Sequence, residues 1–420
     1  MQTDYHLLKR NTLLNLINHL GPISRKKLTE YTDYRPASIS ELTKELIDDQ
    51  LVVERGSLST GPGRRRVLLE LNSARLCAVG VLLSFNHVSY VLSQTDGVIV
   101  ERVDTDITDS PDDRLADIIV EKIMGLIKAH PERYVVGIGL ADPLFDEAHF
   151  GFATTLPKIY DRFIDWGHME LKSKLEKMVD IPVKNFSAMM LPALVEQHYG
   201  TAKGKQDFIC VEISNGLGMS IMCNGEVVKG FQGRAGEFGH TTINFGAENR
   251  SMCYCGKTGC VEADAAFPYI RKNISEALKN GAYSALLDFH DPDKPLTVQD
   301  VRRGLDMGDI LCEHYVRESA RRIGAAIANI VNVLNPESVV LYGSLTQLGD
   351  FFINEIKSIL RRNTLVYLRD YQVVVNEEME SLLPLGAAAQ MFNEFLNVDS
   401  YSWIYKLQPE GEADLEDTEE

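Results

Sequence analysis

Short runs of strand-forming residues alternate with amphipathic segments along most of this chain, from Asn72 to about residue 398. The strand-like runs end in turn residues and cover 79–83, 135–140, 208–213 and 339–342. The helical segments cover about 113–129, 168–178, 189–199 and 312–334. This alternation predicts an α/β fold in which helices cover the sheets and ligands bind at the carboxyl ends of the strands. The length suits two lobes around a cleft.

The N-terminal segment, residues 1–71, has a different pattern. Apolar residues recur at helical spacing up to Gly21-Pro22, which ends the run. Ser24 is a good N-cap for a short second helix, and Pro36 stands near the start of a third. The segment therefore opens with three predicted helices.

Two apolar strands, 51–54 and 67–71, follow the third helix and are joined by a loop rich in glycine and arginine. Three helices and a hairpin with a basic tip form the layout of a winged helix-turn-helix, in which the third helix enters the major groove and the wing touches the adjacent backbone. We therefore expect residues 1–71 to bind a palindromic operator in double-stranded DNA. A small helical subdomain with a solvated charged loop is the alternative.

The third helix, which runs to about Asp49, is predicted to have two faces. Its apolar stripe consists of Ile39, Leu42, Leu46 and Ile47. The opposite face is expected to carry Arg35, Ser38, Ser40, Thr43 and Lys44, which are residues able to bond base edges and phosphates. The predicted DNA contacts are Arg35, Ser38, Ser40 and Lys44 on this helix and Arg64, Arg65 and Arg66 in the hairpin loop.

Charge is divided unevenly along the chain. The formal net charge of -17 argues against a nucleic-acid partner, but residues 1–70 carry eleven Lys and Arg against nine Asp and Glu. Part of the remaining acidity lies in the segment 399–420, whose last eleven residues hold seven carboxylates without apolar periodicity. That composition predicts a disordered acidic tail.

Neither a membrane span nor a secretory signal is predicted. No apolar run approaches the ~20 residues needed to cross a bilayer, and the N-terminus lacks the apolar core of a signal peptide. A cytoplasmic protein without membrane insertion is expected. Its seven cysteines are an odd number, so metal ligation or plain burial explains them better than a disulfide framework.

Four potential metal ligands lie close together in the sequence: His240, Cys253, Cys255 and Cys260. Soft ligands of this kind, with Cys-x-Cys-x4-Cys on a glycine-rich loop, fit a closed tetrahedral zinc site. Because no ligand position remains for water, we expect the zinc to be structural. Buried free cysteines beside an unrelated histidine are the alternative.

Two parts of the sequence resemble the ROK family of repressors, open reading frames and kinases. SRKKLTEYTDYRPASISELTKELIDDQLVVERG, followed by GPGRRRVLLELN, is similar to the DNA-binding arm of the family. GRAGEFGHTTIN, followed by CYCGKTGCVE, is similar to the ROK signature. The resemblance covers roughly residues 5–398 and implies that residues 72–398 adopt a two-lobed, actin-like sugar-kinase fold.

The resemblance also implies a sugar site. In the family the zinc holds a loop that carries sugar contacts, and Glu237, His240 and Glu262 match the sugar-facing acid, the histidine shared by zinc and sugar, and the second sugar-facing acid. Carboxylates that accept from paired hydroxyls give directional bonds to a polyol, and a rigid metal loop fixes their geometry. The alternative for Glu237 is a salt bridge or a helix-dipole interaction.

A catalytic base is missing from this pattern. ROK kinases carry their aspartate in a segment resembling Pro-Val-x-Val-Glu-Asn-Asp, which matches residues 182–188 here. Ala188 stands at the base position and cannot accept a proton, and in the alternative register Phe186 stands there.

The phosphate-binding loops are also depleted. Close approach of backbone N–H groups to phosphate requires glycines, yet residues 214–220 keep two of the four in the family pattern and 341–345 keep one of three. Residues 139–143 and 154–157 depart from the sugar loops of the family as well. We therefore expect no enzyme activity.

The sequence as a whole predicts a DNA-binding transcriptional repressor of carbohydrate metabolism genes, with an inactive sugar-kinase-like sensor. Its expected partners are operator DNA, a sugar or sugar-phosphate effector and further copies of the chain in a homodimer or homotetramer. One alternative is a glucose or N-acetylhexosamine kinase that retains a DNA-binding arm. Another is a regulator titrated by a phosphotransferase-system protein.

Overall fold

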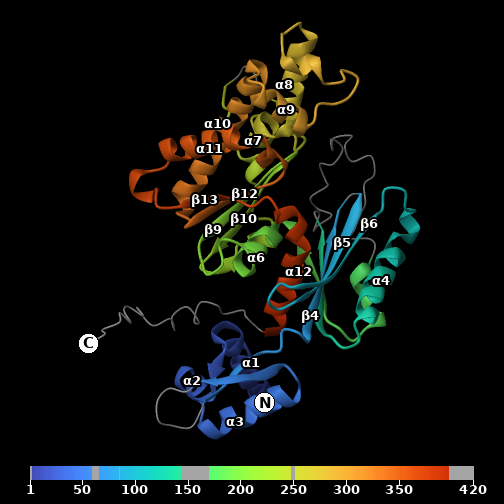
Figure 1. Ribbon diagram of the computed structural model, residues 1–420, viewed down its shortest axis with the longest axis vertical. Helices are drawn as coiled ribbons and strands as arrows, with labels where there is room; N and C mark the ends of the chain where they lie inside the picture. Colours follow the sequence, from blue (N-terminus) through green and yellow to red (C-terminus); the bar gives the residue numbers. More distant parts are fainter. Residues whose placement is uncertain (1, 59–65, 85, 143–169, 247–250, 397–420) are drawn as a thin grey trace.

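The computed structural model describes residues 2–58, 66–84, 86–142, 170–246 and 251–396. Figure 1 shows these residues as three groups of elements that follow one another along the long axis of the molecule. Predictions for Arg64 and Arg65, for residues 143 and 154–157, and for the acidic tail lie outside the described residues. In the described part, no helix is both long enough and apolar enough to cross a membrane.

The N-terminal group contains three helices and a β-hairpin in the order that the sequence predicts. Its elements are α1 (Gln2–Leu20), β1 (Ile23–Ser24), α2 (Arg25–Tyr31), α3 (Pro36–Asp48), β2 (Val52–Leu58) and β3 (Arg66–Leu71). The three strands pair antiparallel in the order β1-β3-β2. Ser24 caps α2 as expected, because its hydroxyl accepts a hydrogen bond from the Lys27 N–H at 3.3 Å.

The first lobe is a five-stranded sheet with helices against it. Its elements are β4 (Leu76–Leu83), β5 (His87–Gln94), β6 (Ile99–Asp106), α4 (Asp112–Ala129), β7 (Tyr134–Asp142), α5 (Leu171–Met178) and β8 (Val183–Ser187). The strand order is β6-β5-β4-β7-β8, with β4, β7 and β8 parallel to one another. Every residue of β4 is buried, as is typical of a central strand covered on both faces.

A short 3-10 helix, Ala188–Met190, and α6 (Leu191–His198) lead into the second lobe. The strands of that lobe are β9 (Phe208–Ile213), β10 (Leu217–Cys223), β11 (Glu226–Val227), β12 (Ser338–Tyr342) and β13 (Gln372–Val375), in the order β11-β10-β9-β12-β13. The helices are α7 (Val261–Ala265), α8 (Phe267–Lys279), α9 (Val298–Asp306), α10 (Ile310–Leu334) and α11 (Asp350–Asn363). The two lobes match the predicted α/β, actin-like architecture.

The last described helix, α12 (Met379–Leu396), returns from the second lobe to the first, and Figure 1 shows it beside β4. It packs on β4, β7 and α6. Two glycines permit this approach, because a β-carbon at Gly80 would overlap the Pro384 carbonyl and one at Gly139 would lie 2.6 Å from the Ala387 carbonyl oxygen. The helix therefore lies almost directly on the backbone of the sheet.

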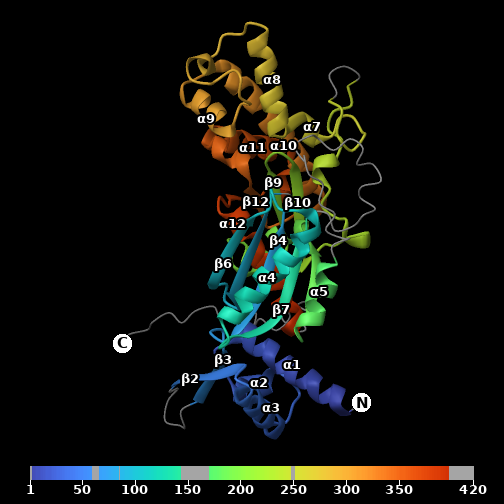
Figure 2. The ribbon, with the colours of Figure 1, turned by 90° about the vertical axis from the view of Figure 1, so that its right-hand side faces the viewer.

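One apolar core joins the N-terminal group to the first lobe. Buried side chains of α1, such as Leu13 and Ile17, belong to the same cluster as Leu76 in β4 and Phe392 in α12. The buried Asn15 amide donates a hydrogen bond to the Leu396 carbonyl at the end of α12. Figure 2 shows α1 running directly beneath the first lobe. The N-terminal group is thus packed against the rest of the chain rather than suspended from it.

Candidate functional site

The four predicted metal ligands converge in the second lobe. His240 ends a 3-10 helix, Phe238–His240, while Cys260 is the N-cap residue of α7. His240 Nδ1 lies 3.5 Å from Cys253 Sγ, and Cys255 Sγ lies 3.7 Å from Cys260 Sγ. All four ligand atoms lie within 4.8 Å of one another. Zn–N and Zn–S bonds of about 2.0 and 2.3 Å give tetrahedral edges of about 3.5 Å and 3.8 Å, so these side chains fit that ion.

The protonation of the thiols also suits metal binding. Burial raises the pKa of Cys253 and Cys260. The pKa of Cys255 is lowered despite its burial, because the Lys257 N–H and the two other thiols hydrogen-bond to its sulfur. The cluster thus favours a thiolate at Cys255 that accepts hydrogen bonds from the other two thiols. A divalent cation can displace the protons of those thiols.

The second nitrogen of His240 faces away from the thiols. Its Nε2 lies 3.2 Å from the Tyr254 hydroxyl and 3.8 Å from Glu237 Oε2. The Tyr254 ring meets the imidazole edge-on, with 5.2 Å between the ring centroids. His240 therefore joins the cysteine cluster, through Nδ1, to the predicted sugar-facing acid.

Glu262, the second predicted sugar-facing acid, lies in the first turn of α7. Its Oε2 accepts a hydrogen bond from the Leu217 N–H at 2.8 Å, so it holds the first residue of β10. Burial raises the pKa of this carboxyl, although the Leu217 N–H and His240 act in the opposite direction. The Tyr254 side chain thus lies against His240 and Glu262, and Glu237 lies on the same side of the imidazole.

Ala188 begins the 3-10 helix between β8 and α6, and Ser187 caps that helix by accepting from the Met189 N–H at 3.3 Å. In the alternative register, Phe186 lies buried in the core that α12 shares with the first lobe. Met189, which follows Ala188, lies against the start of β10: a β-carbon at Gly218 would be 2.9 Å from its methyl group.

Side chains lie over the glycines of residues 214–220, the first of the two segments that resemble phosphate-binding loops. Glu262 Oε2 covers Gly216, since a β-carbon there would lie 3.1 Å from it, and Met189 covers Gly218. The two depleted loops also bond to each other, with 2.9 Å between the hydroxyl oxygens of Ser214 and Ser344. Apolar, anionic and hydroxyl groups therefore lie against the two segments that resemble phosphate-binding loops.

Glu212 is a half-buried acid that sequence reasoning missed. It pairs with Tyr342 across the adjacent strands β9 and β12, near their carboxyl ends. Burial, followed by the charges of Glu380 and Glu262, raises the pKa of Glu212 to about 7. A single carboxylate in the otherwise apolar run FICVEI was the available signal.

Only part of the α3 face that the sequence predicts to be exposed is exposed in the structure. Arg35, Ser40 and Lys44 are exposed and Ser38 is half-buried. Thr43 is fully buried, contrary to expectation, and its hydroxyl accepts a hydrogen bond from Arg25 Nε at 2.9 Å. The reason is helical geometry: Thr43 follows Ile39 by four residues and so lies on the same, core-facing side. Arg66 is the first residue of β3.

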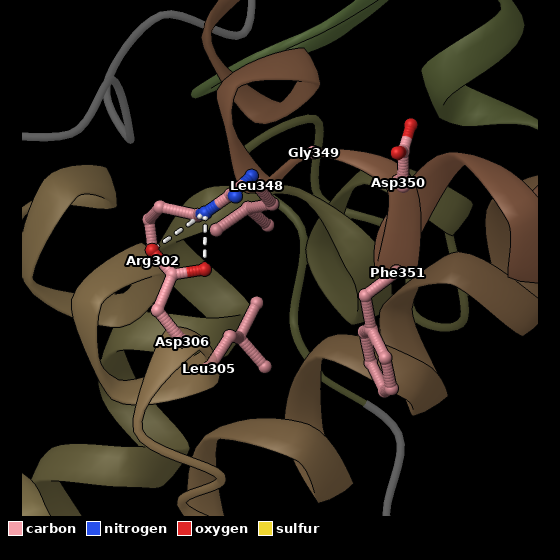
Figure 3. A pocket seen from close by; sticks show the side chains of 7 residues that line it. All are labelled: Arg302, Leu305, Asp306, Leu348, Gly349, Asp350 and Phe351. Carbon is pink, nitrogen blue, oxygen red and sulfur yellow. Dashed lines mark hydrogen bonds and ion pairs between the residues drawn. The ribbon is translucent and has the colours of Figure 1, made fainter.

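A separate cavity of about 330 Å³ lies between α9 and the start of α11, and Figure 3 shows the side chains that line it. Its lining is Arg302, Leu305, Asp306, Leu348, Gly349, Asp350 and Phe351. Arg302 Nε and Asp306 Oδ1, 2.9 Å apart, form an ion pair at its wall. The cavity contains none of the residues predicted from the sequence.

Comparison with known sequences finds the ROK family and proteins named as sugar repressors. The sequence profile described as the ROK family matches residues 79–393. A xylose repressor of Caldicellulosiruptor bescii is 27% identical over 406 residues, covering 95% of this chain and 100% of that protein. An N-acetylglucosamine repressor of Escherichia coli O157:H7 is 25% identical over 397 residues, covering 93% of each chain.

Solved structures show the same fold. A ROK family transcriptional regulator, described as a homologue of the E. coli MLC protein, superposes with a TM-score of 0.77 at 24% identity and covers 94% of this chain and 98% of its own. A ROK family glucokinase from Streptomyces griseus, in complex with glucose and AMPPNP, gives a TM-score of 0.58 at 23% identity. That kinase covers 75% of this chain and 98% of its own.

Proposed function

Because this chain belongs to the ROK family, we propose that it is a transcriptional repressor of carbohydrate genes in which a catalytically inactive ROK portion senses a sugar. The observation that carries this proposal is the exposed polar face of α3 on a winged helix-turn-helix joined to the ROK fold. The glucokinase covers only three quarters of the chain, whereas proteins named as repressors cover nearly all of it.

In this proposal the chain has three parts with different tasks. Residues 1–71 bind a palindromic operator through Arg35, Ser38, Ser40 and Lys44 and through the wing arginines Arg64, Arg65 and Arg66. Residues 72–398 bind the effector and hold the copies of the chain together as a homodimer or homotetramer, while 399–420 form an acidic tail.

The cleft lacks the groups that phosphoryl transfer needs. Ala188 offers no acceptor for the proton of a sugar hydroxyl, and losing a general base typically costs 10²–10⁴-fold in rate. The segments 214–220 and 341–345 would form the phosphate cradle of a kinase in this family. Met189, Glu262 and the Ser214–Ser344 bond occupy it here, so nucleotide positioning is lost as well. These two defects are independent, which supports a sensor over the sugar-kinase alternative.

A structural zinc completes the effector site in this proposal. His240, Cys253, Cys255 and Cys260 would hold it, and it would supply a rigid, charged anchor for the loop beside Glu237 and Glu262. Nδ1 of His240 faces the thiols. With the zinc on Nδ1, the neutral imidazole would carry its proton on Nε2 and could donate it to a ligand hydroxyl.

A continuous set of contacts connects this site to the DNA-binding face. Met189 touches the glycine that precedes Glu237, since a β-carbon at Gly236 would lie 3.7 Å from its methyl group. Met189 leads directly into α6, which packs against α12, and α12 meets α1. A sugar that shifts the loop around Glu237 would thereby change the placement of α1. The free energy of that shift is limited to the difference in the sugar's affinity for the two placements.

Selection from a randomised duplex library, followed by gel-shift titration at several salt concentrations, tests DNA binding. Lys44→Ala should weaken binding to all sequences alike and reduce the salt slope, whereas Ser40→Ala should alter base preference by about 1–3 kcal/mol. Lys122→Ala, an equal loss of charge on exposed α4, is the matched control. Equal losses in both lysine variants, or no selected sequence, would contradict the proposal.

The sensing role needs its own test on the same complex. D-xylose, D-glucose or N-acetyl-D-glucosamine is expected to change the affinity of the intact chain for the selected duplex. ATP-dependent phosphorylation of the same sugars would instead identify a kinase. A duplex that is released only by a phosphotransferase-system protein would favour the remaining alternative.

A further inference from the structure

We propose that the Tyr254 hydroxyl is an internal stand-in for a ligand hydroxyl, and that it must leave its place before a neutral polyol binds between Glu237, His240 and Glu262. This inference rests on the proposed sensing function, because it concerns the same cleft. It adds the chemical class of the effector, uncharged at this position, and a residue that sets its affinity.

The position of the Tyr254 hydroxyl is the first argument. It lies 3.2 Å from His240 Nε2 and also hydrogen-bonds to the Glu262 carboxylate. Glu237 Oε2 lies 3.8 Å from the same nitrogen. The phenol oxygen therefore lies against two of the three predicted sugar-facing groups, and the third, Glu237, lies beside the same imidazole nitrogen.

The hydrogen-bonding pattern is the second argument. A hydroxyl can accept one bond and donate another. With His240 Nδ1 on the metal, the Nε2–H is the donor to the Tyr254 oxygen, which leaves the phenol hydrogen for the Glu262 carboxylate beside it. A sugar hydroxyl offers the same pair of bonds. An ionised phosphate offers chiefly acceptors, so it could not donate to Glu262, and it would stand beside the carboxylates of Glu237 and Glu262. The site therefore favours a neutral polyol over a phosphorylated one at this position.

The mobility of the side chain is the third argument. Tyr254 lies between Cys253 and Cys255, so its backbone is tied to the cysteine cluster on both sides. Its side chain is nevertheless 40% exposed. A change of rotamer can move the hydroxyl into solvent while the loop keeps its place, which costs far less than opening the loop itself.

Isothermal titration of the zinc-loaded chain with D-glucose, D-xylose and N-acetyl-D-glucosamine tests this inference. Tyr254→Phe removes the hydroxyl and keeps the ring, so it should tighten sugar binding by about 2- to 12-fold, the factor for one net hydrogen bond of about 0.5–1.5 kcal/mol. Tyr283→Phe, at an exposed tyrosine elsewhere in the lobe, should leave affinity unchanged. Equal zinc content in all proteins shows that the loop is intact.

Each outcome of the titration has a definite meaning. Tighter binding by Tyr254→Phe, including binding where the unmodified chain shows none, supports the inference. Weaker or unchanged binding overturns it and leaves the sensing function standing, because Tyr254 is then a ligand contact or a bystander. Absence of binding by both proteins overturns sensing and inference together. Tighter binding of glucose 6-phosphate than of glucose overturns the preference for a neutral ligand.

A second measurement needs no variant. Nitration of tyrosines by tetranitromethane, read by peptide mass spectrometry, should become faster at Tyr254 when saturating sugar displaces its ring from His240. The rate at Tyr283 should not change. A rate at Tyr254 that falls or stays constant with bound sugar contradicts displacement.

Discussion

The close approach of α12 to β4 gives the sharpest stability prediction. Gly80→Ala adds one methyl group at the point where the Pro384 carbonyl and the Ala388 nitrogen face the strand. Both neighbours are backbone atoms of α12, so neither can swing aside as a flexible side chain would. The helix must move as a unit or the strand must bend.

The expected magnitude follows from these contacts. Inserting a methyl group into a well-packed core typically costs about 1–3 kcal/mol of unfolding free energy. We expect the upper part of that range, about 3 kcal/mol, because α12 is also held against β7, where a β-carbon at Gly139 would lie 2.6 Å from the Ala387 carbonyl oxygen. A shift that relieves one contact therefore tightens or breaks the other.

The chain supplies a matched control for this experiment. Gly125 lies in the exposed part of α4, and a β-carbon there would meet nothing within 4 Å. Gly125→Ala should raise the unfolding free energy by about 0.5–1 kcal/mol, since alanine is the better helix former. The same chemical change is thus expected to have opposite signs at the two sites.

Urea unfolding followed by circular dichroism measures both variants. Gly80→Ala should also weaken binding to the selected DNA duplex, because α12 contacts α1 through Leu396 and Asn15. If Gly80→Ala unfolds at the same urea concentration as the unmodified chain, the reasoning about the α12–β4 contact is refuted.

Three further predictions concern the cleft. Cys255→Ser should lose the metal and loosen the loop before DNA binding is affected, and metal analysis would detect the loss. A zinc content near zero in unmodified protein purified without chelator would contradict the assignment. Ala188→Asp alone should not produce ATP-dependent sugar phosphorylation in a coupled assay, because the phosphate cradle stays filled; appreciable turnover would show otherwise. The pKa of Glu212 in the folded chain, about 7, lies above its unfolded value of about 4.3, so stability should fall by up to roughly 3 kcal/mol as pH rises between those values. Glu212→Gln should flatten that decline in urea unfolding at pH 5 and pH 8, and an unchanged slope would dismiss the role of Glu212.

Local features of this chain could be predicted from its sequence. Caps and periodicity placed α2, α3 and α10 close to their observed bounds, and the strand at 208–213 coincides with β9. The four side chains of the candidate metal cluster could be found because they lie close together in sequence and share one chemistry. In each case the deciding interaction is local.

Features that depend on distant contacts could not be found in this way. Pro384 within α12 argues against a helix, and only packing of the following alanine-rich turns on β4 and β7 explains why it persists. The covering of Gly218 by Met189 and the pairing of Glu212 with Tyr342 join residues that nothing in their spacing connects. Thr43 is different, since a stricter use of the helical repeat would have assigned it to the core.

The apolar core that α1 shares with the first lobe has a consequence for the operator. A DNA-binding domain on a flexible linker would tolerate operator half-sites at many separations, because the linker can change its length. Here the N-terminal group is fixed to the first lobe by a shared core that includes Leu13 and Phe392. In the proposed symmetric assembly, the packing of the lobes would therefore set the distance and helical phase between the two α3 helices. Operators should then differ in base sequence more freely than in half-site spacing, where one inserted base pair turns the second site by roughly a tenth of a helical turn.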